Sequence, residues 1–578
     1  MNFERLYLEG VRNLERWYEA VPARWIVRDE KSEYYGQYSS FQMIPDNNEI
    51  GMVKTAVCNY CCKDSKYYKD RSLLDFIENY SRIAISKLNE DGTNTMFQSN
   101  FRTGEQFGLE RLSRPLLAFN KYLDKNDEAE VRAHKAVCEL VERLALGCLN
   151  GGFHTPNHRW VETAGLLTAR RALIDAGFTA YTDKMLEKAN KYLAEGVDCD
   201  ETGEWSERSA GMYNEHCDRV MLHIYEMTGN EEYYDAAYRN LMLMRYYIND
   251  DMSMFTQNSH RKDKGEVGSM PMFYKATTYY SDIYVLNYAR AAYLKKDAYL
   301  ASLACEIFDS ETFSRHHILW EIESFLLYPE MITWEFDKVD GTIPTEYEIF
   351  QPKSNIVRKK TKYATYSLIA DNPSFMHIDA GGIHIKMRLC SSFFAVAQFI
   401  PQKLEKTDRG YKLEMIAHGE YKLPLDDPDG VSTKDYWTID YKARKAIQQI
   451  DLDMKVETVF TDGGADFYVS VTGCDKVPTK LEFAVNPGLL CEVGDAVMFT
   501  KAGGSLFSRG NALRLESAAG GGVCEIDGLF CTHLYAEDMR GSLDPIEGAF
   551  TVYATDFAPF EKKISLKISK ADGPRTFK

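Results

Sequence analysis

The segment NGGFHTPNH, residues 150–158, is one of four similar loops that decide how this chain folds. The other three are NEDGTNTMFQSN from residue 89, DETGEWSE from residue 200 and NDDMSMFTQNSH from residue 249. Their starts are 61, 50 and 49 residues apart, so each interval has room for one helical hairpin. A repeat of this size is typical of stacked helix pairs, in an open solenoid or a closed toroid. If every second helix runs the same way, the four loops lie at one end of the array.

The segments between these loops have the apolar spacing of helices. Residues 127–149 and 209–227 each place apolar side chains on one face at helical spacing. The second segment ends at the turn sequence TGN, residues 228–230. Further helices are expected at residues 160–176, 180–196, 231–247 and 272–294.

After about residue 335 the pattern changes to short apolar or alternating runs broken by Gly and Asp. FMHIDAGGIHIKMRLCSSFFAVAQFI, residues 375–400, and YKLEMIAHGEYKL, residues 411–423, are examples. The predicted fold is therefore α+β and multidomain. An N-terminal (α/α) toroid, an incomplete barrel of helical hairpins, would cover residues 1–335. A C-terminal antiparallel β-sandwich would cover residues 336–578. Residues 316–334, HHILWEIESFLLYPEMITW, fit either a last helix or a first strand.

Composition excludes several classes of protein. The formal net charge of −17 argues against nucleic acid as a partner, because phosphate contacts need a basic face. No apolar run approaches the roughly 20 residues of a membrane span, so no membrane partner is expected. The first residues lack the apolar stretch of a secretory signal, and thirteen scattered cysteines favour reduced thiols. We therefore expect a cytoplasmic protein. Its oligomeric state is left open.

Two of the recurrent loops carry more polar chemistry than a connector needs. Asn157 and His158 precede one predicted hairpin, and Tyr213 opens the next. An amide, an imidazole and a phenol at one end of a toroid suit β-elimination from a uronic acid. In that reaction a donor stabilises the charge that develops at the carboxylate, a base takes the C5 proton, and an acid protonates the departing oxygen at C4. Asn157 is the candidate donor, His158 the base or electrostatic partner, and Tyr213 the acid.

Other polar and aromatic side chains in the same loops are candidates for contact with a substrate. An acidic substrate needs cations concentrated near the site, because the chain as a whole is strongly acidic. Each candidate also has a structural reading, such as a helix cap, a core side chain or a solvated loop charge. The predicted substrate-binding residues are Gln98, Arg159, Trp205, Glu207, His260 and Arg261.

The pair Asn157–His158, then Glu207 and Ser209 leading to Tyr213, resembles the pattern in polysaccharide lyases with a helical toroid and a C-terminal β-sandwich. These include oligoalginate lyases and heparinase II/III-like enzymes. The resemblance implies that Asn157 neutralises a uronate carboxylate, His158 assists as base and Tyr213 shuttles the proton. It implies a carbon–oxygen lyase that leaves a 4,5-unsaturated uronate end. Without a secretory signal, an acidic oligosaccharide is the expected substrate.

No cofactor or catalytic metal is expected. HIDAGGIH contains His377, His384 and an Asp within eight residues, so a structural zinc ion is possible there, although neither His lies in a motif that we can match to the lyases.

Two other functions compete with the lyase. A glycoside hydrolase on the same toroid would need two opposed carboxylates. Glu204, Glu207 and either Asp251 or Asp91 lie near the loops and could supply them. A third possibility is a scaffold without catalytic activity, because helical repeats often serve only binding.

Overall fold

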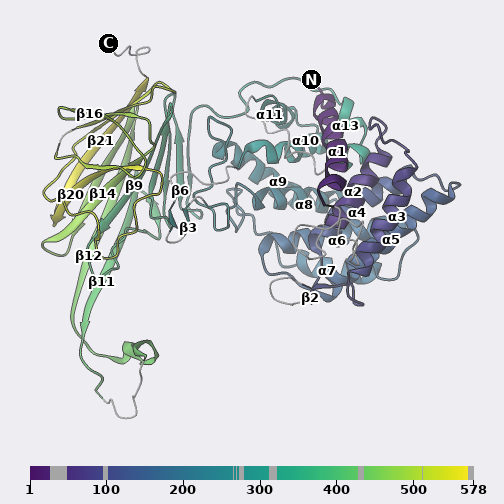
Figure 1. The fold of residues 1–578 in the computed structure, drawn as a ribbon, viewed down its shortest axis with the longest axis horizontal. Coiled ribbons are helices and arrows are strands. Elements are labelled where there is room, and N and C mark those ends of the chain that lie inside the picture. Colours follow the sequence, from purple (N-terminus) through teal and green to yellow (C-terminus); the bar gives the residue numbers. More distant parts are fainter. Residues whose placement is uncertain are drawn as a thin grey trace. The chain divides into compact units, whose positions relative to one another are not determined.

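The computed structural model describes most of the chain and divides it into two compact units. The described residues are 1–25, 48–95, 102–264, 266–267, 270–271, 279–310, 322–426, 435–510 and 512–570. The first unit comprises Met1–Asp263 and Thr278–Ile343, and the second comprises Lys264–Thr277 and Pro344–Lys578. The first unit is helical and the second consists mainly of β-strands (Figure 1). This confirms the predicted fold class.

The helical unit is built from hairpins. Its helices are α1 (Glu4–Trp25), α2 (Asn48–Cys61), α3 (Ser72–Ser86), α4 (Gln106–Tyr122), α5 (Glu128–Asn150), α6 (Pro156–Asp175), α7 (Thr182–Leu193), α8 (Tyr213–Thr228), α9 (Glu231–Met244), α10 (Val285–Lys295), α11 (Ala298–Phe308), α12 (Glu323–Leu327) and α13 (Glu330–Thr333). The segment that fitted either a helix or a strand thus contains two short helices in its described part. The helix expected at 272–294 begins only at Val285 within the described residues.

Helices with even numbers form an inner row and the others cover it. Helix α4 packs on α2 and α6, and α8 packs on α6 and α10. Every residue from Trp160 to Ala169 of α6 is buried, as expected for a helix enclosed on several sides. Helix α7, on the outside, buries only Thr182, Met185 and Ala189. Each recurrent loop precedes an inner helix, so these loops introduce the N-terminal ends of α4, α6, α8 and α10.

The second unit contains two large sheets that pack through one apolar core. One sheet has the strand order β10-β11-β12-β13-β21-β19-β18-β15-β16, and the other has the order β17-β20-β14-β9-β8-β7-β6-β5. Among these strands only β17 and β20 pair in parallel. In β13 (Gly464–Thr472) the buried Phe467 and Val469 alternate with the partly exposed Tyr468 and Ser470. This period of two fixes which face of the sheet meets the core.

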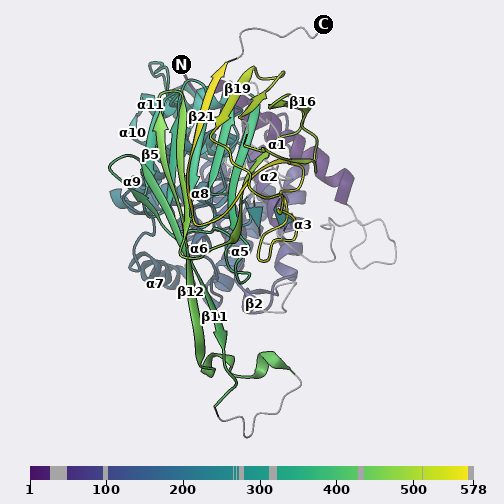
Figure 2. The ribbon, with the colours of Figure 1, turned by 90° about the vertical axis from the view of Figure 1, so that its left-hand side faces the viewer.

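The strands of the second unit have these bounds: β5 (Tyr347–Gln351), β6 (Ile356–Lys360), β7 (Thr365–Ile369), β8 (Met376–Ala380), β9 (Ile383–Ser391), β10 (Leu404–Lys406), β11 (Tyr411–Lys422), β12 (Ala446–Thr461), β14 (Val477–Val485), β15 (Leu490–Val493), β16 (Ala496–Phe499), β17 (Ser505–Phe507), β18 (Leu513–Glu516), β19 (Gly522–Asp527), β20 (Phe550–Ala558) and β21 (Phe560–Lys570). Strands β11 and β12 continue as a two-stranded ribbon beyond the sheets (Figures 1 and 2).

The cysteines of the chain are reduced and lie mostly in the core. All thirteen cysteines lie in described segments as free thiols, and twelve of them are buried. The dense group of Cys58, Cys61 and Cys62 is packed in the core, with at most 2% of any of these residues exposed. Among the described residues, no helix is both long enough and apolar enough to cross a bilayer.

Candidate active site

The recurrent loops meet at the start of helix α6. Pro156 occupies the first helical turn, where its missing N–H is not needed, and Thr155 precedes it in an extended conformation. Asn157 follows and is fully buried. Its Nδ2 donates to Oε2 of Glu207 at 2.7 Å and to Oγ1 of Thr155 at 3.3 Å. Both amide hydrogens of Asn157 therefore have acceptors within the protein, and its hydrogen bond to Glu207 joins two of the loops.

Glu207 is the junction of three loops. Only 5% of this residue is exposed. Its Oε1 lies 2.9 Å from an Nη of Arg261, and its backbone carbonyl accepts the N–H of His260 at 3.2 Å. Burial raises the pKa of Glu207, while the hydrogen bond from Asn157 and the charge of Arg261 act in the opposite direction. The carboxyl group thus fixes the position of Arg261 beside the start of α8.

Tyr213 is the first residue of α8 and is partly exposed. Its backbone N–H donates to Oγ of Ser209 at 3.1 Å, which closes the loop in front of the helix. The Arg261 guanidinium lies 4.6 Å from the centroid of the Tyr213 ring. The contact places a cation against the face of the phenol ring, at the start of α8.

The loop before Tyr213 has a strict steric requirement at Gly211. A Cβ atom there would lie 2.8 Å from Cγ of Tyr279 and 2.9 Å from Cγ2 of Thr256. The Gly211 N–H also donates to Oδ2 of Asp263 at 3.0 Å. Close packing of this glycine therefore helps to hold the Tyr213 backbone in place.

Two imidazoles lie near Tyr213, linked through the ring of Phe107. The Phe107 centroid is 5.0 Å from that of His158 and 5.6 Å from that of His216. The His216 ring is in turn 5.9 Å from the Tyr213 ring. Burial, together with the nearby His154, Arg261 and His216, lowers the pKa of His158 to about 4. His158 is therefore a neutral imidazole near pH 7.

His216 and Phe107 were not among the predicted site residues. His216 is one helical turn after Tyr213, a spacing that places both on one face of α8. Its Nδ1 is hydrogen-bonded to Oε2 of Glu215. Glu215 is itself held by Arg219, whose Nε is 3.4 Å from Oε1, and by the amide of Asn287. The interval of three residues from Tyr213 was the available signal for His216.

Three predicted substrate-binding residues that the structure describes lie apart from the cluster around Tyr213, and a fourth is not described. The Trp205 ring is buried, with 1% of the residue exposed, and its Nε1 donates to Asp218 at 2.9 Å. Arg159 forms ion pairs with Glu195 and Asp198 and stacks on Trp160. His260 is exposed and is tied to Glu207 through its backbone. Gln98 lies outside the described residues.

The acids that a hydrolase would use are engaged in local structure. Glu204 is buried, accepts hydrogen bonds from Asn214 at 3.0 Å and Tyr247 at 2.8 Å, and burial raises its pKa to about 7. Asp91 and Asp251 each accept a backbone N–H two residues later, at 3.0 Å in both turns. These contacts explain the acids as turn and core residues.

The possible zinc residues show no metal geometry. His384 is hydrogen-bonded through Nδ1 to Asp379, and His377 is buried in β8. Within the described ranges, no group of three or more His, Cys, Asp or Glu side chains is arranged to hold a metal ion.

The structure of this chain is similar to solved structures of other proteins. No family model and no curated protein sequence matches the chain. A heparan sulfate lyase from Pedobacter heparinus has a similar structure, with a TM-score of 0.51 and 10% identity over 97% of this chain and 84% of that one. A chondroitin AC lyase from Streptomyces coelicolor A3 gives a TM-score of 0.54 and 10% identity over 98% of this chain and 80% of that one. The chain therefore shares the toroid and sandwich fold of solved polysaccharide lyases, as its resemblance to them around Asn157, His158 and Tyr213 implied.

Proposed function

We propose that this chain is an enzyme that cleaves an acidic oligosaccharide by β-elimination at a uronic acid residue. The observation that carries the proposal is the position of Tyr213. Its partly exposed phenol lies beneath the Arg261 guanidinium and next to the imidazole of His216, with the neutral imidazole of His158 in the same cluster. This set contains an acid, a base and a cation, which are the three functions that elimination from a uronate needs.

In the proposed reaction Arg261 binds the uronate carboxylate and stabilises the charge that develops when C5 loses its proton. Neutral His158 accepts that proton. The electrons of the C5–H bond form the C4=C5 double bond as the C4–O bond breaks, and the Tyr213 hydroxyl gives its proton to the departing oxygen. The proton on His158 then returns to the Tyr213 phenolate, so the enzyme ends in its starting state.

The roles of Asn157 and Glu207 in this proposal differ from those that the resemblance implies. Both amide hydrogens of Asn157 are used within the protein, so Asn157 is a positioning residue for Glu207. Glu207 in turn positions Arg261. Arg261 takes over the neutralisation of the substrate carboxylate, which the motif alone assigned to Asn157.

Ultraviolet absorbance tests the reaction directly. The protein would be incubated with acidic oligosaccharides of the alginate, glycosaminoglycan, pectic and glucuronate–rhamnose types. Elimination creates a double bond conjugated to the carboxylate, so absorbance should rise with at least one substrate. Tyr213→Phe should lower that rate by about 10³-fold, because it removes the proton donor. Tyr225→Phe, on the same helix, is the matched control and should stay within about twofold of wild type. Chain shortening without absorbance would refute the lyase and indicate hydrolysis.

A further inference from the structure

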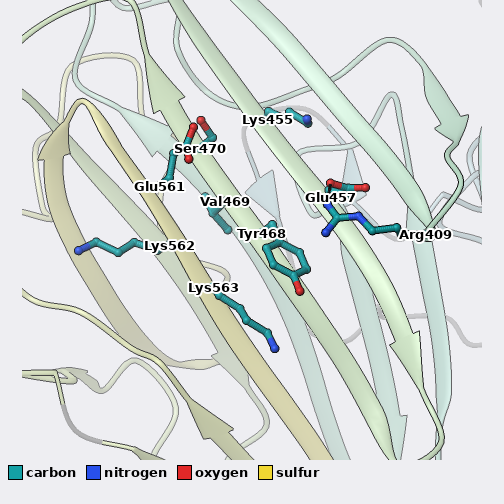
Figure 3. Close-up of a pocket in the computed structure, with 9 residues that line it drawn as sticks. All are labelled: Arg409, Lys455, Glu457, Tyr468, Val469, Ser470, Glu561, Lys562 and Lys563. Carbon is teal, nitrogen blue, oxygen red and sulfur yellow. Dashed lines mark hydrogen bonds and ion pairs between the residues drawn. The ribbon is translucent and has the colours of Figure 1, made fainter.

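A hollow of about 330 Å³ lies on the outer face of the nine-stranded sheet, where β12, β13 and β21 run side by side (Figure 3). None of its residues belongs to the cluster around Tyr213. They come from these three strands and from the turn between β10 and β11. The lining residues are Arg409, Lys455, Glu457, Tyr468, Val469, Ser470, Glu561, Lys562 and Lys563.

Strand register places the central side chains in two rows. Tyr468 pairs with Glu457 on one neighbouring strand and with Lys563 on the other. Two residues along β13, Ser470 pairs in the same way and forms a second row. Directly opposed side chains on one face of a sheet are about 5 Å apart at Cβ, and rows two residues apart are separated by about 7 Å. The hollow is therefore a fixed surface in which each side chain has a defined neighbour.

The carboxylate in the first row is already neutralised. Glu457 accepts hydrogen bonds from Arg409 at 2.6 Å and from the Thr407 hydroxyl at 3.2 Å. The same guanidinium lies 5.0 Å from the centroid of the Tyr468 ring. Lys563 is 2.8 Å from Asp466, and Asp466 also accepts from Ser565. Acidic groups near the tyrosine thus have cations beside them, and they present little bare negative charge to a ligand.

The second row holds a cation that is not neutralised. Lys455 is exposed and forms no ion pair with any residue that the structure describes. It lies opposite Ser470 on β13, whose other neighbour is Glu561, and opposite Glu414 on β11. Glu414 is paired with Lys412 at 3.0 Å.

Of the four cations in the lining, Arg409 is paired with Glu457, Lys562 with Asp556 at 3.3 Å and Lys563 with Asp466. Lys455 is therefore the lining cation that keeps its charge available to a ligand.

We propose that this hollow binds an acidic oligosaccharide, as a site separate from the residues of the proposed reaction. Lys455 would attract a carboxylate of the ligand. The hydroxyls of Tyr468 and Ser470 can donate to or accept from sugar hydroxyls, and Glu561 can accept from them. A ligand that carries both carboxylates and hydroxyls uses all of these groups. A ligand that offers only negative charge would meet the Glu561 carboxylate unfavourably.

Lysine footprinting locates such binding without depending on turnover. The full-length protein with Tyr213→Phe would be acetylated with and without each of the four acidic oligosaccharide types, and the modified lysines would be identified by mass spectrometry. An acidic oligosaccharide that binds here should slow acetylation of Lys455 and Lys563 about fivefold or more. Lys501, an exposed lysine of the same unit outside the hollow, should not change. Neutral oligosaccharides of equal length should protect neither lysine.

Substitutions in the hollow test the proposal through the binding affinity for the acidic oligosaccharide. Lys455→Glu should weaken binding of the acidic ligand about tenfold at low salt, with a smaller effect as salt screens the charge. Tyr468→Phe, which keeps the ring beneath Arg409 and removes the hydroxyl, should weaken it about threefold to tenfold. Lys501→Glu is the control for net charge and should leave the affinity unchanged. The proposal is overturned if no acidic oligosaccharide protects Lys455, or if inorganic sulfate protects it equally well. Absorbance measured separately on the enzyme with intact Tyr213 reports on the proposed reaction, so the two ideas can fail independently.

Discussion

Replacing Arg261 with alanine separates the two things that this residue does in the structure. Toward the protein, Arg261 neutralises the carboxyl group of Glu207 at 2.9 Å. Toward the proposed substrate, it lies over the Tyr213 ring, and its side chain is partly exposed. Loss of a charged donor that stabilises a developing negative charge costs about 10²–10³ in kcat, so Arg261→Ala should lose at least that much activity.

The stability cost of Arg261→Ala can be worked from burial. Breaking a buried ion pair costs about 3–5 kcal/mol, because the remaining charge stays buried without its partner. The Arg261 side chain is 27% exposed and the Glu207 side chain 5% exposed, so solvent screening reduces the expected cost to about 2 kcal/mol. In a Glu207→Gln background Arg261→Ala leaves no buried charge behind, so it should lower the free energy of unfolding by only about 0.5 kcal/mol. The coupling free energy is then about 1.5 kcal/mol.

Urea unfolding and initial rates of absorbance change would be measured on all four members of this cycle. We expect Arg261→Ala to regain most of its stability in the Glu207→Gln background, while its activity stays at least about 10²-fold below that of Glu207→Gln alone. Recovery of activity together with stability would show that Arg261 acts only by holding the fold. A kcat/KM within about threefold of wild type for Arg261→Ala would refute its role at the substrate carboxylate.

Three further changes test the surroundings of Tyr213. Because the pKa of His158 is lowered to about 4, the unfolded chain binds more protons than the folded chain between about pH 4 and 6.5, and the free energy of unfolding should fall by about 2 kcal/mol as the pH drops through this window. His158→Gln should reduce that slope and the rate together. Burial also lowers the pKa of His134 to about 4, so replacing His134 should reduce the pH dependence of the free energy of unfolding and leave the reaction rate unchanged. Equal losses of rate in the His158 and His134 variants would contradict the role of His158 as the base. Gly211→Ala should destabilise the protein by about 1–3 kcal/mol and lower kcat, because a methyl group would meet a tyrosine ring at 2.8 Å; Gly152→Ala, with open space around it, should do neither in the same urea and rate assays. Trp205→Phe should cost about 1–3 kcal/mol through the lost hydrogen bond to a buried carboxyl group, and a raised KM without that loss in urea unfolding would show instead that the ring contacts substrate.

Periodicity in the sequence is sufficient to predict the architecture. Apolar residues recur at helical spacing through residues 127–149 and at a period of two through strands such as β13, and each period exposes one apolar face that must be buried. The recurring loops are also readable, because their Gly, Asn and Asp residues stop one helix before the next begins. These local signals predicted that the segments around Asn157 and Tyr213 lie at one end, and the structure does bring them together through Glu207.

The orientation of each side chain within those loops depends on contacts between segments that are far apart in the sequence. Glu207 turns inward because Asn157 and Arg261, 50 and 54 residues away, supply its partners, and local sequence carries no record of that pairing. Trp205, two residues earlier, was an equally good candidate by type, yet packing buries its ring against α8. His216 reaches the cluster through the rotation of α8, and Phe107 reaches it from α4. The sequence by itself determined the helices, the strands and the end of the toroid at which polar loops gather, because these follow from local periodicity. Only the tertiary structure decided which of those polar groups meet, because that depends on the packing of whole helices against one another.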